Sequence, residues 1–289
     1  MRYDFAKLNG IGNDFVMIED LDDEILLTPE QITALCDRHF GIGGDGVIIV
    51  KPSPRPECAA YMDYYNSDGT RAQMCGNGVR CFAKFLVDRG IVDPKAGSFV
   101  ADTLSGPKPI SFTLDADGKL AQATVDMGAP ILEPAQVPTT FGGTETPYGR
   151  VALDADFFID GHALRFTCVS MGNPHAVTFV DKKGLELVDS LGPLVENCEA
   201  FPEGTNVEFA HVDGDVIRMR VWERGCGETL ACGTGACATA VAAHICGYTP
   251  RKVTLELIGG TLQIEWRESD GHVLMTGPAA QNFTGTVEI

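Results

Sequence analysis

Hydrophobic and polar residues alternate in several short segments, which is the pattern of a β-strand with one buried face. In residues 216–223, VIRMRVWE, apolar side chains occupy every second position from Ile217 to Val221, and arginines stand between them. The segments with strand character are 46–50, 110–115, 122–128, 164–172, 216–223, 252–257 and 261–266. They outnumber the predicted helices and do not alternate regularly with them. The pattern therefore predicts an α+β fold rather than a doubly wound parallel sheet.

One helix is predicted shortly before the glycine-rich segment GIGG. Thr28 is a suitable N-cap, Pro29 occupies the first helical position, and Gln31 completes a capping box. We expect the helix to end at Gly41 or Gly43, because glycine readily adopts the left-handed conformation that follows a helix C-terminus.

The chain contains a diverged internal repeat. GIGNDFVMIED at 10–20 is similar to SMGNPHAVTFVD at 170–181, and CGNGVRCFAKFL from Cys75 is similar to CGTGACATAVAA from Cys232. The distance from Asn13 to Cys75 is 62 residues, and the distance from Asn173 to Cys232 is 59. Two pairs of motifs in the same order at nearly equal spacing indicate a duplicated domain.

The domain boundary is expected near the segment 128–149, which is dense in proline and glycine. The predicted domains are 1–130 and 131–276, with a strand near 277–289 that returns to the first domain.

Each Cys-Gly-X-Gly segment leads into a predicted helix. The first helix has apolar residues at 79, 82, 83 and 86, the spacing of one buried face, and the second is small and apolar all round. In a chain so rich in strands, curved sheet is the expected covering for such helices. We therefore predict two pseudo-symmetric domains, each a curved antiparallel or mixed β-sheet barrel around a central helix, with the active site in the cleft between them.

Charge and hydropathy exclude several kinds of partner. The 289 residues carry a formal net charge of −18, and no cluster of Lys and Arg offers a nucleic-acid or anionic-membrane surface. No segment approaches 18 uninterrupted apolar residues, and the N-terminus lacks the pattern of a signal peptide. A cytoplasmic protein that acts on a small molecule is expected.

The two repeated cysteines admit several interpretations. Five residues separate Cys75 from Cys81, more than the two to four of structural zinc pairs, so no metal is expected. GIGGDG at 41–46 matches a dinucleotide-binding motif, but it precedes a strand instead of following one. A disulfide between Cys75 and Cys232 is conceivable, although a cytosolic chain does not normally keep one. Other cysteines are expected to be small buried residues, namely Cys36, Cys81, Cys168 and Cys246.

Chemistry is the interpretation that best accounts for a matched pair of thiols. A cysteine at a helix N-terminus is stabilised as thiolate by the helix dipole and by free N–H groups. Inversion of a carbon stereocentre requires a base on one face and an acid on the other, which two equivalent thiols supply. The N–H groups at Gly76–Asn77 and Gly233–Thr234 can bind a carboxylate beside the developing carbanion. No pyridoxal or other cofactor is then needed.

Six segments together resemble the diaminopimelate epimerase family in the same order over nearly the whole chain. They are GNDF, YNSDGT, MCGNGVRC, SMGNPH, TNVEF and WERGCGETLACGTGACA. The resemblance implies a cofactor-independent two-base epimerase that interconverts LL- and meso-diaminopimelate for lysine and peptidoglycan synthesis. It also implies two similar domains and a homodimer.

The resemblance assigns roles to residues of both repeats. Cys75 and Cys232 are the implied acid–base pair, with His175 as a supporting group. The implied carboxylate donors are the backbone groups of Gly76, Asn77, Gly233 and Thr234, and the residues near the reacting amino group are Asn13 and Glu223. The distal amino-acid end is read by Asn66, Asn173, Asn206 and Arg224, with Arg224 as a bidentate carboxylate clamp.

Three positions depart from the family pattern, and two other functions stay open. Gly46 stands where many members have a substrate-contacting glutamine, Asn9 stands where histidine is frequent, and Cys226 is an additional thiol. One alternative is a proline racemase or hydroxyproline epimerase, which would not need the distal residues. The other is a non-catalytic binding protein on the same fold.

Overall fold

The computed structural model describes residues 2–72 and 74–289, and the chain divides into two compact units. Unit 1 consists of the residues up to Asp126 together with Thr276–Ile289, and unit 2 consists of Met127–Met275. Each unit is described by itself.

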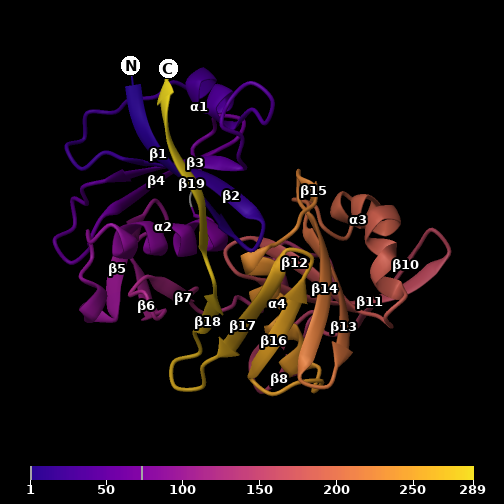
Figure 1. Ribbon diagram of the computed structural model, residues 1–289. Coiled ribbons are helices and arrows are strands. Elements are labelled where there is room, and N and C mark those ends of the chain that lie inside the picture. Colours follow the sequence, from indigo (N-terminus) through magenta and orange to yellow (C-terminus); the bar gives the residue numbers. More distant parts are fainter. Residues whose placement is uncertain (1, 73) are drawn as a thin grey trace. The chain divides into compact units, whose positions relative to one another are not determined.

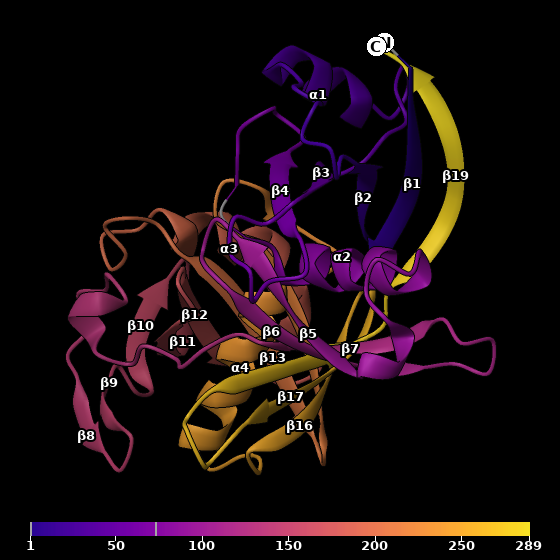
Figure 2. The same ribbon diagram turned by 90° about the vertical axis from the view of Figure 1, so that its left-hand side faces the viewer.

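Unit 1 is built from strands around one long helix. Its strands are β1 (Arg2–Gly10), β2 (Asn13–Glu19), β3 (Gly46–Lys51), β4 (Tyr61–Asn66), β5 (Ser98–Thr103), β6 (Lys108–Leu114), β7 (Leu120–Asp126) and β19 (Ala280–Glu288). Its helices are α1 (Pro29–Cys36), α2 (Gly76–Asp88) and the 3₁₀ turn η1 (Pro94–Ala96). β19 runs antiparallel beside β1, so both termini of the chain lie at the same end of this unit (Figure 1). Figure 2 shows these two strands curving together along its edge.

Unit 2 has the same kind of construction. Its main strands are β10 (Ala155–Ile159), β11 (His162–Ser170), β12 (Pro174–Phe179), β13 (Asn206–Asp213), β14 (Val216–Glu223), β16 (Lys252–Leu257) and β17 (Gly260–Trp266). Short strands are β8 (Thr144–Thr146), β9 (Gly149–Val151) and β15 (Gly227–Glu228), and β18 (Val273–Gly277) spans the boundary of the units. The helices are α3 (Val188–Glu196) and α4 (Gly233–Ile245), with 3₁₀ turns η2 (Pro134–Gln136) and η3 (Gly184–Leu187).

The two units repeat one order of strand pairings. From β1 to β6, successive pairs are antiparallel, parallel, antiparallel, parallel and antiparallel. The same order recurs from β11 through β12, β13, β14 and β16 to β17. The register also corresponds, since Phe15 pairs with Gly46 in unit 1 and His175 pairs with Asn206 in unit 2. Equivalent positions in the two units can therefore be compared directly.

The long helices α2 and α4 are both buried. α4 packs against β11, β12, β13, β16 and β17, and its small side chains allow this close approach on several sides. We predicted a single buried face for α2, and this was wrong, because every residue from Gly76 to Val87 is buried. The charged residues among them direct their polar ends to carbonyl groups. Arg80 donates to the Gly76 carbonyl, and Lys84 donates to that of Leu120.

Helix α1 begins as predicted but ends earlier. Thr28 and Gln31 form the reciprocal hydrogen bonds of a capping box, with Pro29 in the first position. The helix ends at Cys36, before either expected glycine. The Asp37 carboxylate accepts hydrogen bonds from the backbone of His39 and Phe40, and this local turn replaces further helix.

The expected α+β class is confirmed, and each predicted strand corresponds to one in the structure within two or three residues. β14 and β16 have the predicted bounds, and the apolar positions of β14 are buried. Cys246, expected to be buried, is only half-buried because it lies at the end of α4. Among the described helices, none combines the length and the apolar character needed to cross a membrane.

Candidate functional site

In unit 1, the candidate site is centred on the start of α2. Cys75 is the N-cap residue, with extended backbone angles, φ −133° and ψ 122°. Its thiol donates to Asn13 Oδ1 at 3.4 Å, and Asn77 Nδ2 reaches the same oxygen at 3.4 Å. The turn between β1 and β2 thus brings Asn13 onto the cysteine that lies 62 residues further along the chain.

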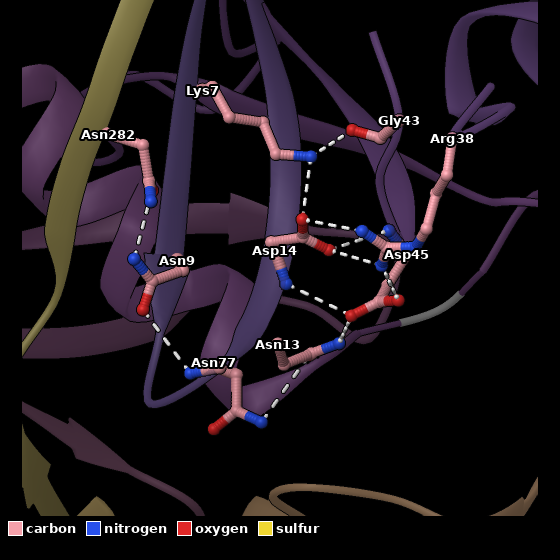
Figure 3. A network of polar contacts seen from close by, with 10 residues as sticks. Lys7, Asn9, Asn13, Asp14, Arg38, Gly43, Asp45, Asn77 and Asn282 are labelled. Atoms are coloured by element: carbon pink, nitrogen blue, oxygen red, sulfur yellow. Dashed lines mark hydrogen bonds and ion pairs between the residues drawn. The ribbon is translucent and has the colours of Figure 1, made fainter. Parts of the chain in front are cut away.

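A network of ion pairs holds Asn13 in place (Figure 3). Asn13 Nδ2 donates to Asp45 Oδ2 at 2.6 Å, and the guanidinium of Arg38 joins Asp45 to Asp14. Lys7 lies 2.8 Å from the other oxygen of Asp14. Burial acts to raise the pKa of Asp14, but Arg38 and Lys7 outweigh it and hold this pKa at about 2. The Asp14 carboxylate is therefore ionised at neutral pH.

In unit 2, the equivalent site is centred on the start of α4. Cys232 is again the N-cap residue with extended backbone. Its sulfur accepts from the Gly235 N–H at 3.4 Å and lies 3.6 Å from Thr234 Oγ1. Burial raises the pKa of Cys232 well above its usual value, and the carboxylates of Glu223 and Glu208 raise it further. Cys232 is accordingly a thiol at neutral pH in this structure.

Asn173 and His175 extend the unit 2 site away from the sulfur. Asn173 Nδ2 donates to Thr234 Oγ1 at 3.3 Å, and Asn173 Oδ1 lies 3.2 Å from His175 Nε2. His175 Nδ1 lies 2.6 Å from Glu208 Oε1, and both side chains are fully buried. Burial raises the pKa of Glu208, while the adjacent His175 opposes this change.

Glu208 is a site residue that the sequence analysis did not single out. The available signal was an acidic residue within the otherwise apolar start of β13, NVEFA. Such a position is unfavourable unless the carboxyl group has a specific partner. The partner, His175, lies 33 residues earlier, and no local pattern connects the two.

Asn206 and Arg224 are joined to each other. Asn206 is buried, its Nδ2 donates to the Pro174 carbonyl at 2.7 Å, and its Oδ1 accepts from the backbone N–H of Arg224 at 3.0 Å. The exposed Arg224 side chain donates to the Glu203 carbonyl at 2.9 Å. Glu223, at the end of β14, accepts a short hydrogen bond from Thr229. Asn206 therefore fixes the backbone that carries the expected carboxylate clamp.

The remaining predicted positions have separate local partners. Asn66 donates to Thr70 Oγ1 at 3.1 Å in the turn after β4, and its backbone position pairs with Gly46. At Gly46, an added Cβ would lie 2.4 Å from the Tyr65 carbonyl oxygen and 2.7 Å from the Tyr64 ring. A glutamine here would require the neighbouring strand to shift, so this position offers no space for a substrate-contacting side chain.

Two other departures from the family pattern also have defined positions. Asn9 donates to Asn282 Oδ1 at 2.9 Å and accepts from the Gly12 N–H, so it joins β1 to β19. Cys226 is exposed in the turn between β14 and β15.

Each unit thus assembles part of the predicted set. Unit 1 brings Cys75, Asn77 and Asn13 together, and unit 2 brings Cys232, Thr234, Asn173 and His175 together. In both, a cysteine is the N-cap residue of a helix whose first N–H groups start at a glycine, Gly76 or Gly233. This arrangement can hold a carboxylate and exchange a proton. Within residues 2–72 and 74–289, no group of His, Cys, Asp and Glu is arranged to bind a metal ion.

Comparison with known protein families gives a single result. The sequence model of the family described as diaminopimelate epimerase matches residues 5–133 and 167–281. A diaminopimelate epimerase of Leptospira biflexa is 47% identical over 290 residues, which cover all of both chains. One from Methanococcus maripaludis is 42% identical over 286 residues, which cover 99% of each.

Comparison with solved structures extends the likeness to the fold of other enzymes. A probable proline racemase from Agrobacterium radiobacter has a TM-score of 0.68 at 16% identity, covering 99% of this chain and 93% of its own. A Bacillus anthracis protein of the PhzF phenazine biosynthesis family has a TM-score of 0.68 at 18% identity, with both chains fully covered. At such low identity the likeness concerns the fold alone.

Proposed function

The chain belongs to the diaminopimelate epimerase family, and from this premise we propose that it interconverts LL- and meso-diaminopimelate. The product serves lysine and peptidoglycan precursor synthesis. The observation that carries the proposal is the pair of cysteines, Cys75 and Cys232, each at the N-cap of a buried helix at the same place in a repeated strand order. Two separate thiols in equivalent settings suit a reaction with one base and one acid.

The reaction proceeds by two proton transfers. The thiolate of one cysteine takes the proton from the α-carbon, so an S–H bond forms while the C–H bond breaks and leaves a carbanion. The thiol of the other cysteine delivers its proton to the opposite face, which restores the C–H bond with inverted configuration and leaves a thiolate. In one direction of the reaction Cys75 is the base and Cys232 is the acid. The roles exchange in the reverse direction.

Backbone N–H groups stabilise the carbanion through the adjacent carboxylate. The donors are those of Gly76, Asn77, Gly233 and Thr234, at the starts of α2 and α4. Negative charge that moves onto the carboxylate during proton removal is favoured by the positive ends of the helix dipoles. This stabilisation replaces the electron sink that a pyridoxal cofactor would supply.

The other proposed contacts select the substrate. Asn13 and Glu223 bind the reacting amino group, and His175 supports the acid–base pair. Asn66, Asn173 and Arg224 bind the distal amino-acid end, with Arg224 pairing with the distal carboxylate. Asn206 acts through Arg224, because its amide is already bonded to the Arg224 backbone.

Deuterium exchange tests the proposal directly. Incubated with LL-diaminopimelate in D₂O, the protein should form the meso isomer with deuterium at the inverted α-carbon. Cys75→Ala and Cys232→Ala should each abolish epimerisation. No exchange by the reduced wild type would refute the epimerase and favour a binding protein. Faster turnover of proline or hydroxyproline than of diaminopimelate would favour the racemase alternative.

We also propose a cytoplasmic homodimer. β19 is exposed along most of its length and presents Phe283 half-exposed, which is suitable for contact with a second copy. Light scattering coupled to size-exclusion chromatography should give twice the chain mass of 30.9 kDa. A monomer at all concentrations would refute the dimer without affecting the proposed reaction.

A further inference from the structure

Four hydrogen bonds in unit 2 connect a buried carboxyl group to the sulfur of Cys232. This hydrogen-bond chain begins at Glu208, which lies 2.6 Å from His175, and His175 lies 3.2 Å from Asn173. Asn173 in turn lies 3.3 Å from Thr234, which lies 3.6 Å from the sulfur of Cys232. All five residues belong to one unit, and they come from β12, β13, the turn before β12 and the start of α4.

The order of donors and acceptors gives this chain a direction. Thr234 Oγ1 accepts from Asn173 Nδ2, so its own hydrogen is available to the sulfur of Cys232. Next along the chain of contacts, Asn173 Oδ1 faces His175 Nε2, and His175 Nδ1 faces the Glu208 carboxyl group. Both ring nitrogens of His175 face oxygen atoms, so a doubly protonated ring can donate to both, with the Glu208 carboxylate as its counter-charge.

The equivalent place in unit 1 holds only apolar residues. The common register aligns Phe15 with His175 and, two residues along the next strand, Ile48 with Glu208. Phe15 and Ile48 are both fully buried. A Cβ added to Gly78 would lie 3.2 Å from Ile48 Cδ1, so this isoleucine packs against the first turn of α2.

Glu208 occupies the same place against α4. A Cβ added to Gly235 would lie 2.7 Å from Glu208 Oε1 and 3.2 Å from Cys232 Sγ. Glycine here lets the carboxyl group and the sulfur approach the same turn of helix. An apolar pair fills this position in one unit, whereas a polar pair fills it in the other.

Stability does not explain the polar pair. Glu208 has no exposed surface, and its Oε2 makes no hydrogen bond to the described residues. Burying a carboxyl group with one oxygen unpaired is costly, and replacing a buried ion pair by apolar residues is frequently neutral or stabilising. Unit 1 has the apolar residues Phe15 and Ile48 at this position. The His175–Glu208 pair in unit 2 therefore lowers the folding stability relative to an apolar pair.

We propose that Glu208 is a positioning residue for proton transfer at Cys232. This role rests on the function proposed above. Glu208 holds His175 as the imidazolium, and through Asn173 it directs the Thr234 hydroxyl to donate to the sulfur of Cys232. The hydroxyl and the Gly235 N–H together stabilise the thiolate that Cys232 becomes once it has delivered its proton. Cys75 has a different setting, because its sulfur donates to Asn13, whose amide donates to Asp45.

The charged and titratable groups around this chain come from four elements. Besides His175 on β12 and Cys232 before α4, Glu208 faces Glu223 on β14 and the buried Cys168 on β11. Burial raises the pKa of Cys168 to about 12, so this thiol stays neutral. Glu223 is the remaining anion, and it acts on Cys232 directly.

The first experiment compares wild type with Glu208→Gln. The NMR chemical shifts of the histidine ring nitrogens are measured, and those of His175 are assigned by their loss in His175→Gln. They should show a doubly protonated His175 ring in the wild type near neutral pH and a singly protonated ring in Glu208→Gln. Because Glu208 and His175 lose their charges together, the net charge near Cys232 is unchanged. We therefore expect kcat/KM for diaminopimelate to fall roughly ten- to hundredfold, the effect of one lost hydrogen bond to a charged group. The limb of the pH profile that reports the Cys232 thiolate should move to higher pH.

A second set separates positioning from folding. His175→Phe with Glu208→Ile reproduces the residues of unit 1, so the protein should unfold at the wild-type temperature or above while activity falls. Asp102→Asn removes another buried carboxylate, in unit 1, and should leave the pH profile unchanged. Thr234→Val should lower activity and Thr234→Ser should restore it. Glu208→Gln should add little to the loss in Thr234→Val, because both act through one hydroxyl.

Three results would overturn the proposal. They are a neutral His175 in the wild type, a pH profile unmoved by Glu208→Gln, and fully additive losses for Glu208→Gln and Thr234→Val. The histidine spectrum does not depend on turnover. The wild type could fail to epimerise diaminopimelate and still show the His175 imidazolium and its loss in Glu208→Gln. That result would refute the proposed function and support the hydrogen-bond chain from Glu208 to Cys232.

Discussion

Single residues in this protein are held by opposing forces whose balance decides their chemistry. Asp14 and Cys232 are both largely removed from water, and burial raises the pKa of both. Arg38 and Lys7 reverse the effect at Asp14, whereas Glu223 and Glu208 reinforce it at Cys232. The same burial therefore gives a permanent anion in one unit and a proton-bearing thiol in the other.

Asp14 should make the protein sensitive to acid. Its pKa is lowered from 3.8 to about 2, so its ionised form contributes stability above about pH 4 that is lost as pH falls toward 2. The contribution is about 2 kcal/mol at neutral pH. Asp14→Asn should flatten the decline of the unfolding free energy between pH 5 and 2, measured by urea denaturation. The exposed Asp22→Asn is the control, and an equal effect of the two substitutions would contradict the prediction.

Arg224 should discriminate substrates by length. Its side chain is exposed and donates to the Glu203 carbonyl through one guanidinium nitrogen, and the group has further donors for a carboxylate. Arg224→Met should lower kcat/KM for diaminopimelate roughly ten- to hundredfold, the value of a charge-assisted bidentate pair. Deuterium exchange into a short amino acid without a distal carboxylate should change little. Equal losses for both substrates would argue against a clamp.

At the scale of elements, close packing fixes positions that appear permissive in the sequence. Gly46 begins β3 and lies against β4 with no space for a Cβ. The buried helix α2 carries Arg80 and Lys84, which the helical pattern alone would have placed at the surface. In both cases the neighbouring strand or carbonyl group decides what the element tolerates.

Gly46→Ala should destabilise unit 1. The added Cβ would meet the Tyr65 carbonyl at 2.4 Å, and backbone atoms cannot move aside as a flexible side chain can. We expect a loss of about 1–3 kcal/mol, typical of overpacking, measured by chemical denaturation. Gly142→Ala is the matched control, because its Cβ would meet nothing within 4 Å. A stable Gly46→Ala protein with altered substrate affinity would show instead that this position is adaptable.

At the scale of the whole molecule, the chain ends by completing the unit in which it began. β19 pairs with β1 over nearly its full length, and α2 packs against β1 on the inner side. Unit 1 is therefore discontinuous in sequence, whereas unit 2 is a single segment, Met127–Met275.

Truncation before Ala280 should damage unit 1 selectively. Loss of β19 leaves the N–H and C=O groups of one edge of β1 without their strand partner. Hydrogen exchange should show lost protection in β1 and β2, with α4 and β13 in unit 2 nearly unchanged. Uniform loss across both units would mean that they unfold as one cooperative body.

Much of the fold could be predicted from local patterns. Alternation located β14 and β16, and the capping box located the start of α1, because these signals depend on neighbours within a few residues. The sequence did not predict the early end of α1. The Asp37 carboxylate accepts backbone hydrogen bonds from the residues that follow it, and this turn ends the helix before the glycines that commonly mark a helix C-terminus.

By itself, the sequence determined the repeated motifs, the strand-rich class and the family. It also determined the placement of Cys75 and Cys232 at helix starts, because a glycine-rich segment before an apolar helix is a local signal. Only the tertiary structure decided which polar groups meet. Glu208 finds His175, and Asn206 is bonded to the Arg224 backbone, across separations of 33 and 18 residues. Such contacts depend on the register of the strands and on burial, because a buried polar group without a partner is costly. The spacing of residues along the sequence does not predict them.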